Sequence, residues 1–423
     1  MRPNGEHALR LSKIGPGLLL AATGVGAGDL ATGSIVGSLL GTAVLWAVLL
    51  GAFLKFVATE GLARWQLATG QTLIEGVATR VSPIVLWLFL PYLLVWSFFV
   101  AAALMGACGV TLHAMLPLFN DARDGKVVFG MLCSLIGLAL VRAGGYRLFE
   151  RVMQLCIGVM FVTVVVTAAL LWPGTKEVLQ GLLIPRIPHA GGQGLSWTVA
   201  LIGGVGGTLT VLCYGYWMRE EGRSQAADLS TCRVDLAVGY LMTALFGIAM
   251  VIIGNSVHVE GSGARLLVVL SDRLGDLLGP TGKWLFLAGS FGAVFSSLLG
   301  VWQAVPYLFA DGWRLSRRHS ADDDNTHTTD TVDTAGPAYR LYLYALALIP
   351  MLGLLQNFRE MQKLYAIVGA SFFPLLALAL LVFNGRTDWV TRRFVNRPAT
   401  VVVLLAFFAF FTWLAFDSTA GLH

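Results

Sequence analysis

The chain has 423 residues, of which 56% are hydrophobic and 13% are charged, and its formal net charge is +5. Ordinary soluble domains of this length do not combine so many apolar residues with so few charges, and repeated long apolar runs are typical of integral membrane proteins. The positive balance does not indicate nucleic-acid binding, because the basic residues lie in short loops between the apolar runs. The composition therefore excludes a soluble protein and predicts an all-α membrane protein.

Eleven apolar segments are predicted as membrane-spanning helices. They lie at residues 14–40, 43–67, 83–112, 127–143, 148–172, 197–218, 234–254, 283–311, 339–355, 363–383 and 399–416. Lysine and arginine concentrate on the cytoplasmic side of membrane proteins. If the N-terminus is cytoplasmic, 19 of the 29 Lys and Arg residues fall on the inner side and nine on the outer side. This bias predicts a multi-pass protein of the cell (inner) membrane with a cytoplasmic N-terminus and an external C-terminus.

A glycine-rich interruption divides the first segment. Three glycines fall within residues 24–28 and are followed directly by Asp29. Glycine in a helix interior costs about 1 kcal/mol relative to alanine, and backbone groups freed from a helix are tolerated at membrane depth only where they line a cavity or face protein. A similar interruption, Gly-Gly-Val-Gly-Gly-Thr at residues 203–208, divides the sixth segment. Because broken spans in corresponding halves mark the central site of many transporters, we expect a substrate site between the two breaks.

Polar side chains near the breaks are the candidate ligands for a substrate or ion. An intramembrane carboxylate is costly and indicates function by default, so Asp29 is a candidate ligand. Capping of the half-helix that follows explains the same position equally well. Thr208 and Thr210 occupy the matching place after the second break, where ligation or local bonding to the backbone would account for them. If the substrate is a metal, Asp29 and Thr210 are its candidate ligands, and the further candidate contributors are Thr23, Gly26, Cys213 and Tyr214.

Two charged residues lie within the second segment. Lys55 and Glu60 are five residues apart, so they do not share one face of a helix. Glu60 is expected to pair with Arg64, four residues further on. An ammonium in mid-span needs a carboxylate or backbone carbonyls, and Asp29 is the natural partner for Lys55. Such a pair would make a divalent cation at Asp29 less favourable.

Short motifs are spread along nearly the whole chain. They are Gly15-Pro16-Gly17, Leu30-Ala31-Thr32, Leu-Ala-Arg-Trp-Gln-Leu-Ala-Thr-Gly at residues 62–70, Gln-Thr-Leu-Ile-Glu at residues 71–75, Val234-Asp235, Ser296-Ser297 and Phe373-Pro374. Together they resemble the natural resistance-associated macrophage protein (NRAMP) family of metal-ion transporters. The resemblance implies a LeuT-like fold in one membrane domain, with inverted five-helix repeats at residues 14–172 and 197–383 and an additional helix at 399–416. It also implies a site where the first and sixth helices unwind.

The motifs that carry function in this family are altered here. The Asp-Pro-Gly-Asn motif falls on Gly26–Asp29, so the leading aspartate is lost and an acid replaces the asparagine. The Met-Pro-His motif falls on Thr210–Leu212, and a hydroxyl does not select soft metals as a thioether does. The acidic pair of the third helix falls on Ser97 and Val100, neither of which titrates. These losses are similar to those of the NRAMP-related magnesium transporters, which nevertheless keep the leading aspartate.

Three functions remain open from the sequence. The first is a secondary transporter of a hard, magnesium-like divalent cation without NRAMP-type proton coupling, because one carboxylate, hydroxyls and carbonyls suit a partly hydrated ion. The second is a transporter of a small organic solute such as an amino acid, which the glycine-rich breaks and Lys55 favour. The third is a non-transporting membrane receptor or scaffold. No motif indicates an enzyme or a cofactor, so the expected partners are the lipid bilayer and a small ion or solute.

Overall fold

The computed structural model describes residues 15–190, 193–256, 265–317, 334 and 336–420. All the regular structure in these residues is helical. In chain order the elements are α1 (Pro16–Gly24), α2 (Ala27–Leu40), η2 (Gly41–Val44), α3 (Leu45–Thr69), α4 (Leu73–Arg80), α5 (Ile84–Met115), α6 (Ala122–Leu170), α7 (Thr175–Leu183), α8 (Gln193–Gly204), η3 (Leu209–Leu212), α9 (Cys213–Glu220), η4 (Ala226–Asp228), α10 (Leu229–Asn255), α11 (Arg265–Ser316), α12 (Pro337–Leu348), η5 (Ile349–Leu355), α13 (Phe358–Ala370), α14 (Phe372–Phe383) and α15 (Pro398–Ala420).

The membrane-spanning helices agree with the sequence prediction. Within the described residues, nine helices are long and apolar enough to cross a membrane, and a shorter apolar helix lies at Pro398–Trp413. These ten segments account for all eleven predicted spans. One of them, Asp29–Thr69, contains both the second half of the first predicted span and the whole of the second. Within α6 lie two further predicted spans, Ala122–Ala143 and Tyr146–Leu170. The predicted all-α membrane architecture is confirmed.

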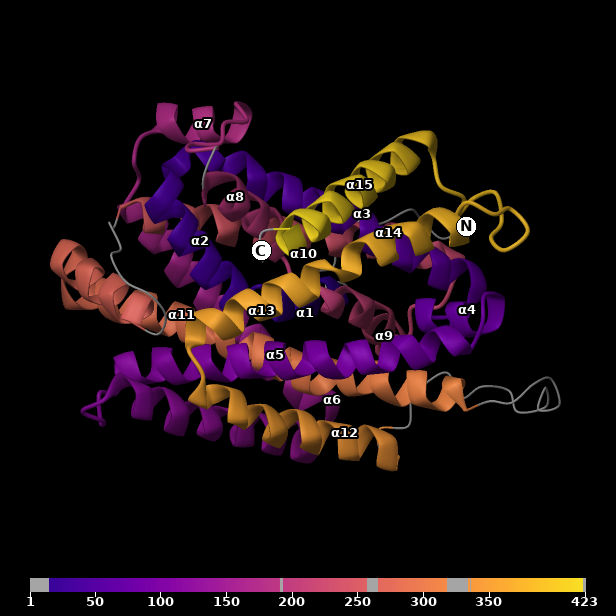
Figure 1. Ribbon diagram of the computed structural model, residues 1–423, viewed down its shortest axis with the longest axis horizontal. Helices are drawn as coiled ribbons and strands as arrows, with labels where there is room; N and C mark the ends of the chain where they lie inside the picture. Colours follow the sequence, from indigo (N-terminus) through magenta and orange to yellow (C-terminus); the bar gives the residue numbers. More distant parts are fainter. Residues whose placement is uncertain (1–14, 191–192, 257–264, 318–333, 335, 421–423) are drawn as a thin grey trace, which may run out of the picture.

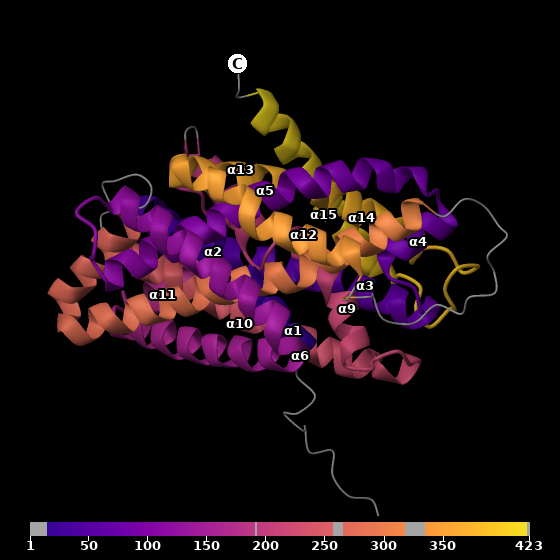
Figure 2. The ribbon, with the colours of Figure 1, turned by 90° about the horizontal axis from the view of Figure 1, so that it is seen from below.

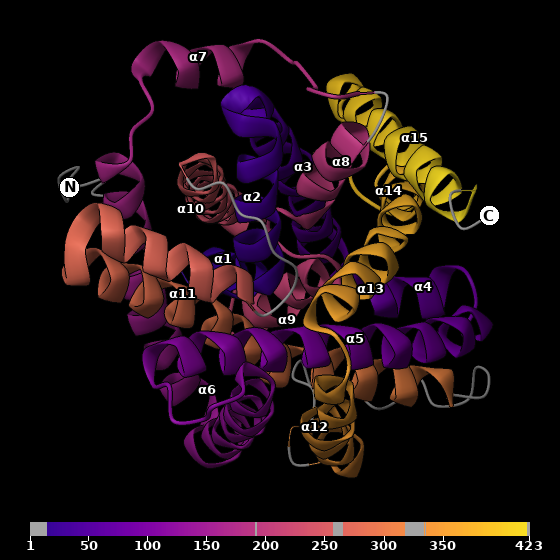
Figure 3. The ribbon, with the colours of Figure 1, turned by 60° about the vertical axis from the view of Figure 1, so that its left-hand side comes forward.

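The helices form an elongated bundle. In Figure 1, α4 and α7 lie toward opposite ends of its longest axis. Helices α5, α6 and α12 lie on one side of the molecule, and α13, α14 and α15 lie together on another (Figure 3). Seen from below, α6 and α11 run along the bundle next to each other, and they pack together (Figure 2). Helix α3 packs against α8 and α9, α10 packs against α1 and α2, and α11 packs against α1, α2 and α9.

Small residues allow α2 and α10 to approach closely. A Cβ atom at Gly37 would lie 2.1 Å from the carbonyl oxygen of Val251, and one at Gly254 would lie 2.3 Å from that of Ser34. No side chain fits at either position. Close backbone contact through small residues is a common way for helices to associate in membranes. This contact holds α2, which begins at the first break, against α10.

The first predicted break separates α1 from α2. Helix α1 ends at Gly24, and the N–H of Val25 still donates to the carbonyl of Ala21 at 2.7 Å. Helix α2 begins at Ala27, with Gly26 as its N-cap residue. The interruption therefore falls within the glycine-rich stretch that predicted it.

The second predicted break separates α8 from η3 and α9. Helix α8 ends at Gly204, and η3 begins at Leu209. Between them Gly206 and Gly207 have φ angles of 78° and 81°. Only glycine adopts this left-handed conformation without steric cost, so the sequence determines where the chain unwinds. Both breaks expected from the sequence are confirmed.

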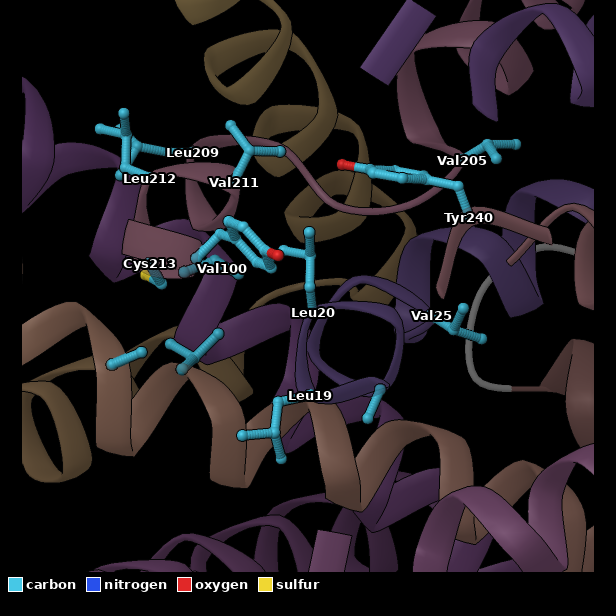
Figure 4. Packing of buried hydrophobic residues seen from close by; sticks show 14 of the residues in the cluster. Leu19, Leu20, Val25, Val100, Val205, Leu209, Val211, Leu212, Cys213 and Tyr240 are labelled. Atoms are coloured by element: carbon cyan, nitrogen blue, oxygen red, sulfur yellow. The ribbon is translucent and has the colours of Figure 1, made fainter. Parts of the chain in front are cut away.

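The two breaks touch each other in the core of the bundle. A Cβ atom at Gly24 would lie 2.6 Å from the carbonyl carbon of Gly206, and one at Gly207 would lie 3.0 Å from the Cα atom of Gly24. Figure 4 shows Val25 and Val205, one from each break, in the part of the core that also contains Tyr240. The fold thus brings together the segments that the sequence marks as the central site.

Candidate functional site at the two helix breaks

Lys55 of α3 donates three hydrogen bonds to the backbone of the second break. Its Nζ atom lies 2.8 Å from the carbonyl oxygen of Gly203 and 2.6 Å from that of Gly207, and it also donates to the carbonyl of Val205. The side chain is fully buried, and Nζ lies 5.0 Å from the ring centroid of Phe373. Three N–H donors meet three acceptors, so the donor capacity of the ammonium is used completely. The carbonyl end of α8 also favours a positive charge.

Asp29 is the third residue of α2 and faces the same break. Its Oδ1 atom accepts a hydrogen bond from the N–H of Gly206 at 3.3 Å. Its Oδ2 atom is buried and has no hydrogen-bond partner among the residues that the structure describes. The N-cap residue of α2 is Gly26, so Asp29 does not occupy the capping position, although the first turn of a helix favours its negative charge.

The expected pairing of Lys55 with Asp29 is wrong. No ion pair joins these two side chains, both of which lie in the described part of the chain. Instead, the peptide group between Val205 and Gly206 lies between them, because its carbonyl accepts from Lys55 and its N–H donates to Asp29. The unwound backbone supplies acceptors that a helix would have consumed internally. The ammonium therefore needs no carboxylate.

The two threonines after the second break have different surroundings. Thr208 accepts a hydrogen bond from the indole N–H of Trp96 at 3.0 Å. The Oγ1 atom of Thr210 is buried and, like Oδ2 of Asp29, has no partner in the described residues. A Cβ atom at Gly207 would lie 2.6 Å from the Thr210 hydroxyl oxygen, so this hydroxyl is next to the unwound segment.

Thr23 and Tyr214 direct their hydroxyl groups away from the breaks. The hydroxyl of Thr23 donates to the carbonyl of Leu19, one turn earlier in α1, at 2.7 Å. The hydroxyl of Tyr214 donates to Oδ2 of Asp235 on α10, at 3.2 Å. Each hydroxyl thus donates to a group of the protein, and the prediction that Thr23 and Tyr214 are ligands stays a prediction.

Gly26 and Cys213, the two remaining candidate ligands, lie at the edges of the breaks. A Cβ atom at Gly26 would lie 2.5 Å from the hydroxyl oxygen of Ser297, so this glycine allows the first break to contact α11. Cys213 is a free and fully buried thiol at the start of α9. A single thiol does not make a soft-metal site, and no group of three or more His, Cys, Asp or Glu side chains gathers in the described residues.

The comparison with known families agrees with this geometry. The family model described as "Natural resistance-associated macrophage protein-like" matches residues 17–420. The chain belongs to the NRAMP family. "Divalent metal cation transporter MntH" of Chromohalobacter salexigens is 25% identical to it over 314 residues, which is 68% of each chain. "Metal transporter Nramp1" of Oryza sativa is 29% identical over 196 residues, covering 46% of this chain and 36% of the relative.

Solved structures share the fold of this NRAMP protein. A manganese transporter of Eremococcus coleocola superposes with a TM-score of 0.75 at 15% identity, covering 99% of this chain and 88% of the other. MhsT, solved in complex with L-phenylalanine, superposes with a TM-score of 0.62 at 14% identity, covering 96% of this chain and all of the other. At such low identity these similarities show the fold alone. The predicted LeuT-like fold with unwound first and sixth helices is confirmed.

Glu60 lies in a separate ion-pair cluster of the NRAMP protein. It pairs with Arg64 at 2.6 Å, as its spacing on the helix predicted, and with Arg233 of α10 at 2.7 Å. Arg64 also donates to the carbonyl of Phe394, at 2.9 Å. Glu60 therefore joins α3 and α10 to the segment before α15, and its charge is compensated away from the breaks.

Two buried carboxylates form further clusters near α9. Asp235 accepts from the guanidinium of Arg223 at 2.7 Å and from the N–H of Gly17, at the start of α1, at 2.8 Å. Asp311 of α11 accepts from the hydroxyl of Tyr216 at 2.8 Å. In the sequence, Asp311 is marked only as a carboxylate at the end of an apolar run, and it was not predicted as a site residue. Both clusters fix the half-helix α9 against its neighbours.

Proposed function

We propose that this NRAMP-family protein is a secondary transporter that moves a hard divalent cation, represented by Mg²⁺, across the cell (inner) membrane. Its N-terminus is then cytoplasmic and its C-terminus external. The observation that carries the proposal is Oδ2 of Asp29, which is buried at the first break without a partner among the described residues. A buried carboxylate oxygen without a hydrogen-bond or metal partner is unfavourable. A bound cation would supply that partner, while Lys55 balances the charge of Asp29 from the other end of the Val205–Gly206 peptide group.

The donor atoms at the breaks favour a hard cation. Asp29 and Thr210 both offer oxygen, which Mg²⁺ and Ca²⁺ prefer, whereas soft metals prefer sulfur and imidazole. Because the described residues hold no cluster of three ligating side chains, an ion bound by Asp29 would keep most of its water. Mg²⁺ dehydrates reluctantly and commonly binds through one or two carboxylates and several waters. The relative from Chromohalobacter salexigens is named as a divalent metal cation transporter, which supports the proposal that the substrate is a divalent cation.

The net charge at the breaks predicts weak binding. The positive charge of Lys55 offsets the negative charge of Asp29, so a divalent cation meets no excess negative charge. We therefore expect a dissociation constant of about 1 mM, equivalent to about −4 kcal/mol, rather than a micromolar constant. An ion present at millimolar concentration suits such a site.

The alternative of an amino-acid-like substrate is less well supported. Carriers with this architecture bind a substrate carboxylate at the free N–H groups of a broken helix. In this protein the N–H of Gly206 already donates to Asp29, so an internal carboxylate takes that donor. The three N–H donors of the Lys55 ammonium are likewise taken by carbonyls, so none is left to bind an anionic solute.

The proposal includes transport without the proton route that the family resemblance implies. The hydroxyl of Ser97 shares a hydrogen bond of 2.6 Å with the hydroxyl of Tyr342. Val100 is buried and apolar. Aliphatic and phenolic hydroxyls do not ionise near neutral pH, so these positions supply no titrating group.

Uptake by purified protein in liposomes tests the proposal. A fluorescent indicator inside the vesicles should report entry of Mg²⁺, and a second dye should report no matching change in luminal pH. Asp29→Asn should abolish uptake, whereas Asp388→Asn, which removes an exposed carboxylate, should leave it unchanged. Uptake of amino acids but of no divalent cation would contradict the proposal, and so would a stoichiometric proton flux.

A further inference from the structure

We infer that the second break contains a binding site for a monovalent cation, and that the ammonium of Lys55 occupies it permanently as a tethered ion. The site consists of the carbonyl oxygens of Gly203, Val205 and Gly207. It is distinct from the divalent-cation site proposed at Asp29. The inference concerns the folded state of the break and does not depend on what the protein transports.

The chemistry of the site is that of a cation site. Carbonyl oxygens that converge on one point can replace the hydration shell of a monovalent ion. Here they converge because left-handed glycines at 206 and 207 interrupt the helix and turn its carbonyls toward α3. The carbonyl group of Gly203 lies in the last turn of α8, where the partial negative charge of the helix end favours a cation.

The dimensions and charge separate this site from a divalent site. The Nζ to oxygen distances of 2.8 and 2.6 Å exceed the roughly 2.0–2.1 Å that Mg²⁺ requires. No carboxylate takes part, since Lys55 and Asp29, both described, are not joined by an ion pair. Neutral carbonyls at this spacing suit a single positive charge.

The surroundings hold the ammonium in place. Lys55 is fully buried, and its own carbonyl accepts from the hydroxyl of Thr59 at 2.8 Å. The Thr59 hydroxyl also shares a hydrogen bond of 2.7 Å with the hydroxyl of Tyr240 on α10. The ring of Phe373, 5.0 Å from Nζ, adds a cation–π contact. The break is therefore complete without any dissociable monovalent ion, and its stability should not depend on Na⁺ or K⁺.

Thermal unfolding of the purified full chain tests this inference. Wild-type protein should have the same midpoint temperature in choline, sodium, potassium and n-propylammonium chloride. Lys55→Ala removes the ammonium and opens space, so its midpoint should fall in choline. It should then rise saturably with n-propylammonium, Na⁺ or K⁺, because an ion that binds only the folded state stabilises it by mass action.

A matched variant tests whether added cations need the cavity that Lys55→Ala opens. Lys55→Met keeps most of the aliphatic stem but has no charge, so its midpoint should fall without recovery in any of these salts. Lys55→Arg, which keeps the charge, should lie closer to wild type than Lys55→Met. A Lys55→Met protein as stable as wild type would overturn the inference, as would a Lys55→Ala protein that no cation stabilises or a wild-type protein that needs Na⁺. None of these outcomes bears on divalent-cation uptake, so the two proposals fail independently.

Discussion

Lys55 and Asp29 bind opposite ends of the same peptide group. The carbonyl of Val205 accepts from Lys55, and the N–H of Gly206 donates to Asp29. Two opposite charges thus fix the orientation of the unwound backbone without contacting each other. One oxygen of Asp29 stays without a partner in the described structure, and this oxygen is the feature on which the proposed cation site depends.

The first prediction concerns the unequal structural roles of these two residues. Lys55→Met should destabilise the protein strongly, because three buried carbonyls lose their donors, at about 1–3 kcal/mol for each unsatisfied group. Asp29→Asn should have a small effect, because the amide oxygen can still accept from Gly206. Thermal unfolding of the two variants in detergent measures the difference.

A double variant separates this account from a direct ion pair. If the two residues formed a buried pair, removing either partner would cost about 3–5 kcal/mol and removing both would restore much of the loss. We expect instead that Asp29→Asn together with Lys55→Met is at least as unstable as Lys55→Met alone. Recovery of stability in the double variant would contradict the hydrogen-bonding arrangement described above.

The second prediction concerns the conformation of the second break. Gly206→Ala places a side chain at a φ of 78°, which costs about 1–3 kcal/mol in a residue other than glycine. The added Cβ atom would also lie 3.2 Å from Thr243 and 3.3 Å from Tyr240. A matched control is Gly203→Ala in α8, where the Cβ atom would make an ordinary contact of 3.4 Å with Phe411. The midpoint temperature should fall for the first variant only, and equal behaviour of the two would show that the left-handed turn is unimportant.

The third prediction concerns the buried ion pair between Arg223, in the loop after α9, and Asp235 of α10. Arg223→Met removes the cation beside Asp235, which is 1% exposed, and should cost about 3–5 kcal/mol of stability. Lys283→Met breaks an exposed pair with Asp272 at a similar distance and should cost less than about 1 kcal/mol. Thermal unfolding of both variants tests the comparison, and equal losses would indicate that burial does not determine the strength of these pairs.

The fourth prediction concerns metal preference. Thr210→Met introduces a thioether at the position where the family resemblance places a methionine. We expect this variant to bind Cd²⁺ at least tenfold more tightly than the unmodified protein, with little change for Mg²⁺. Leu209→Met adds a thioether at the neighbouring buried position and serves as the control. Calorimetric titration measures both, and equal Cd²⁺ affinity of the two variants would show that Thr210 does not face the ion.

Features that depend on residue type and local spacing were predictable from the sequence. The two breaks fall at the glycines of residues 24–28 and 203–207. The positive φ angles at Gly206 and Gly207 favour glycine, whereas at Gly24 and Gly26 close contact with neighbouring segments leaves no room for a Cβ atom. The pair between Glu60 and Arg64 follows from a spacing of one helical turn. The division into repeats at residues 14–172 and 197–383 stays a prediction.

Features that depend on helix rotation and three-dimensional proximity were not predictable. The sequence offered Asp29 as the partner of Lys55, but the carbonyls that replace it are present in every residue and carry no sequence signal. Tyr214 was expected at the breaks, yet the rotation of α9 turns its hydroxyl toward Asp235. Only the packed structure determines such orientations.

The central claim is that Asp29 binds the divalent cation. Calorimetric titration of the purified protein with Mg²⁺, Mn²⁺ and Cd²⁺ tests it directly. We predict millimolar binding of Mg²⁺, no tighter binding of Mn²⁺ or Cd²⁺, and complete loss of binding in Asp29→Asn but not in Asp388→Asn. Binding of Mg²⁺ by Asp29→Asn at unchanged affinity, or micromolar binding of Mn²⁺ without binding of Mg²⁺, would contradict the claim.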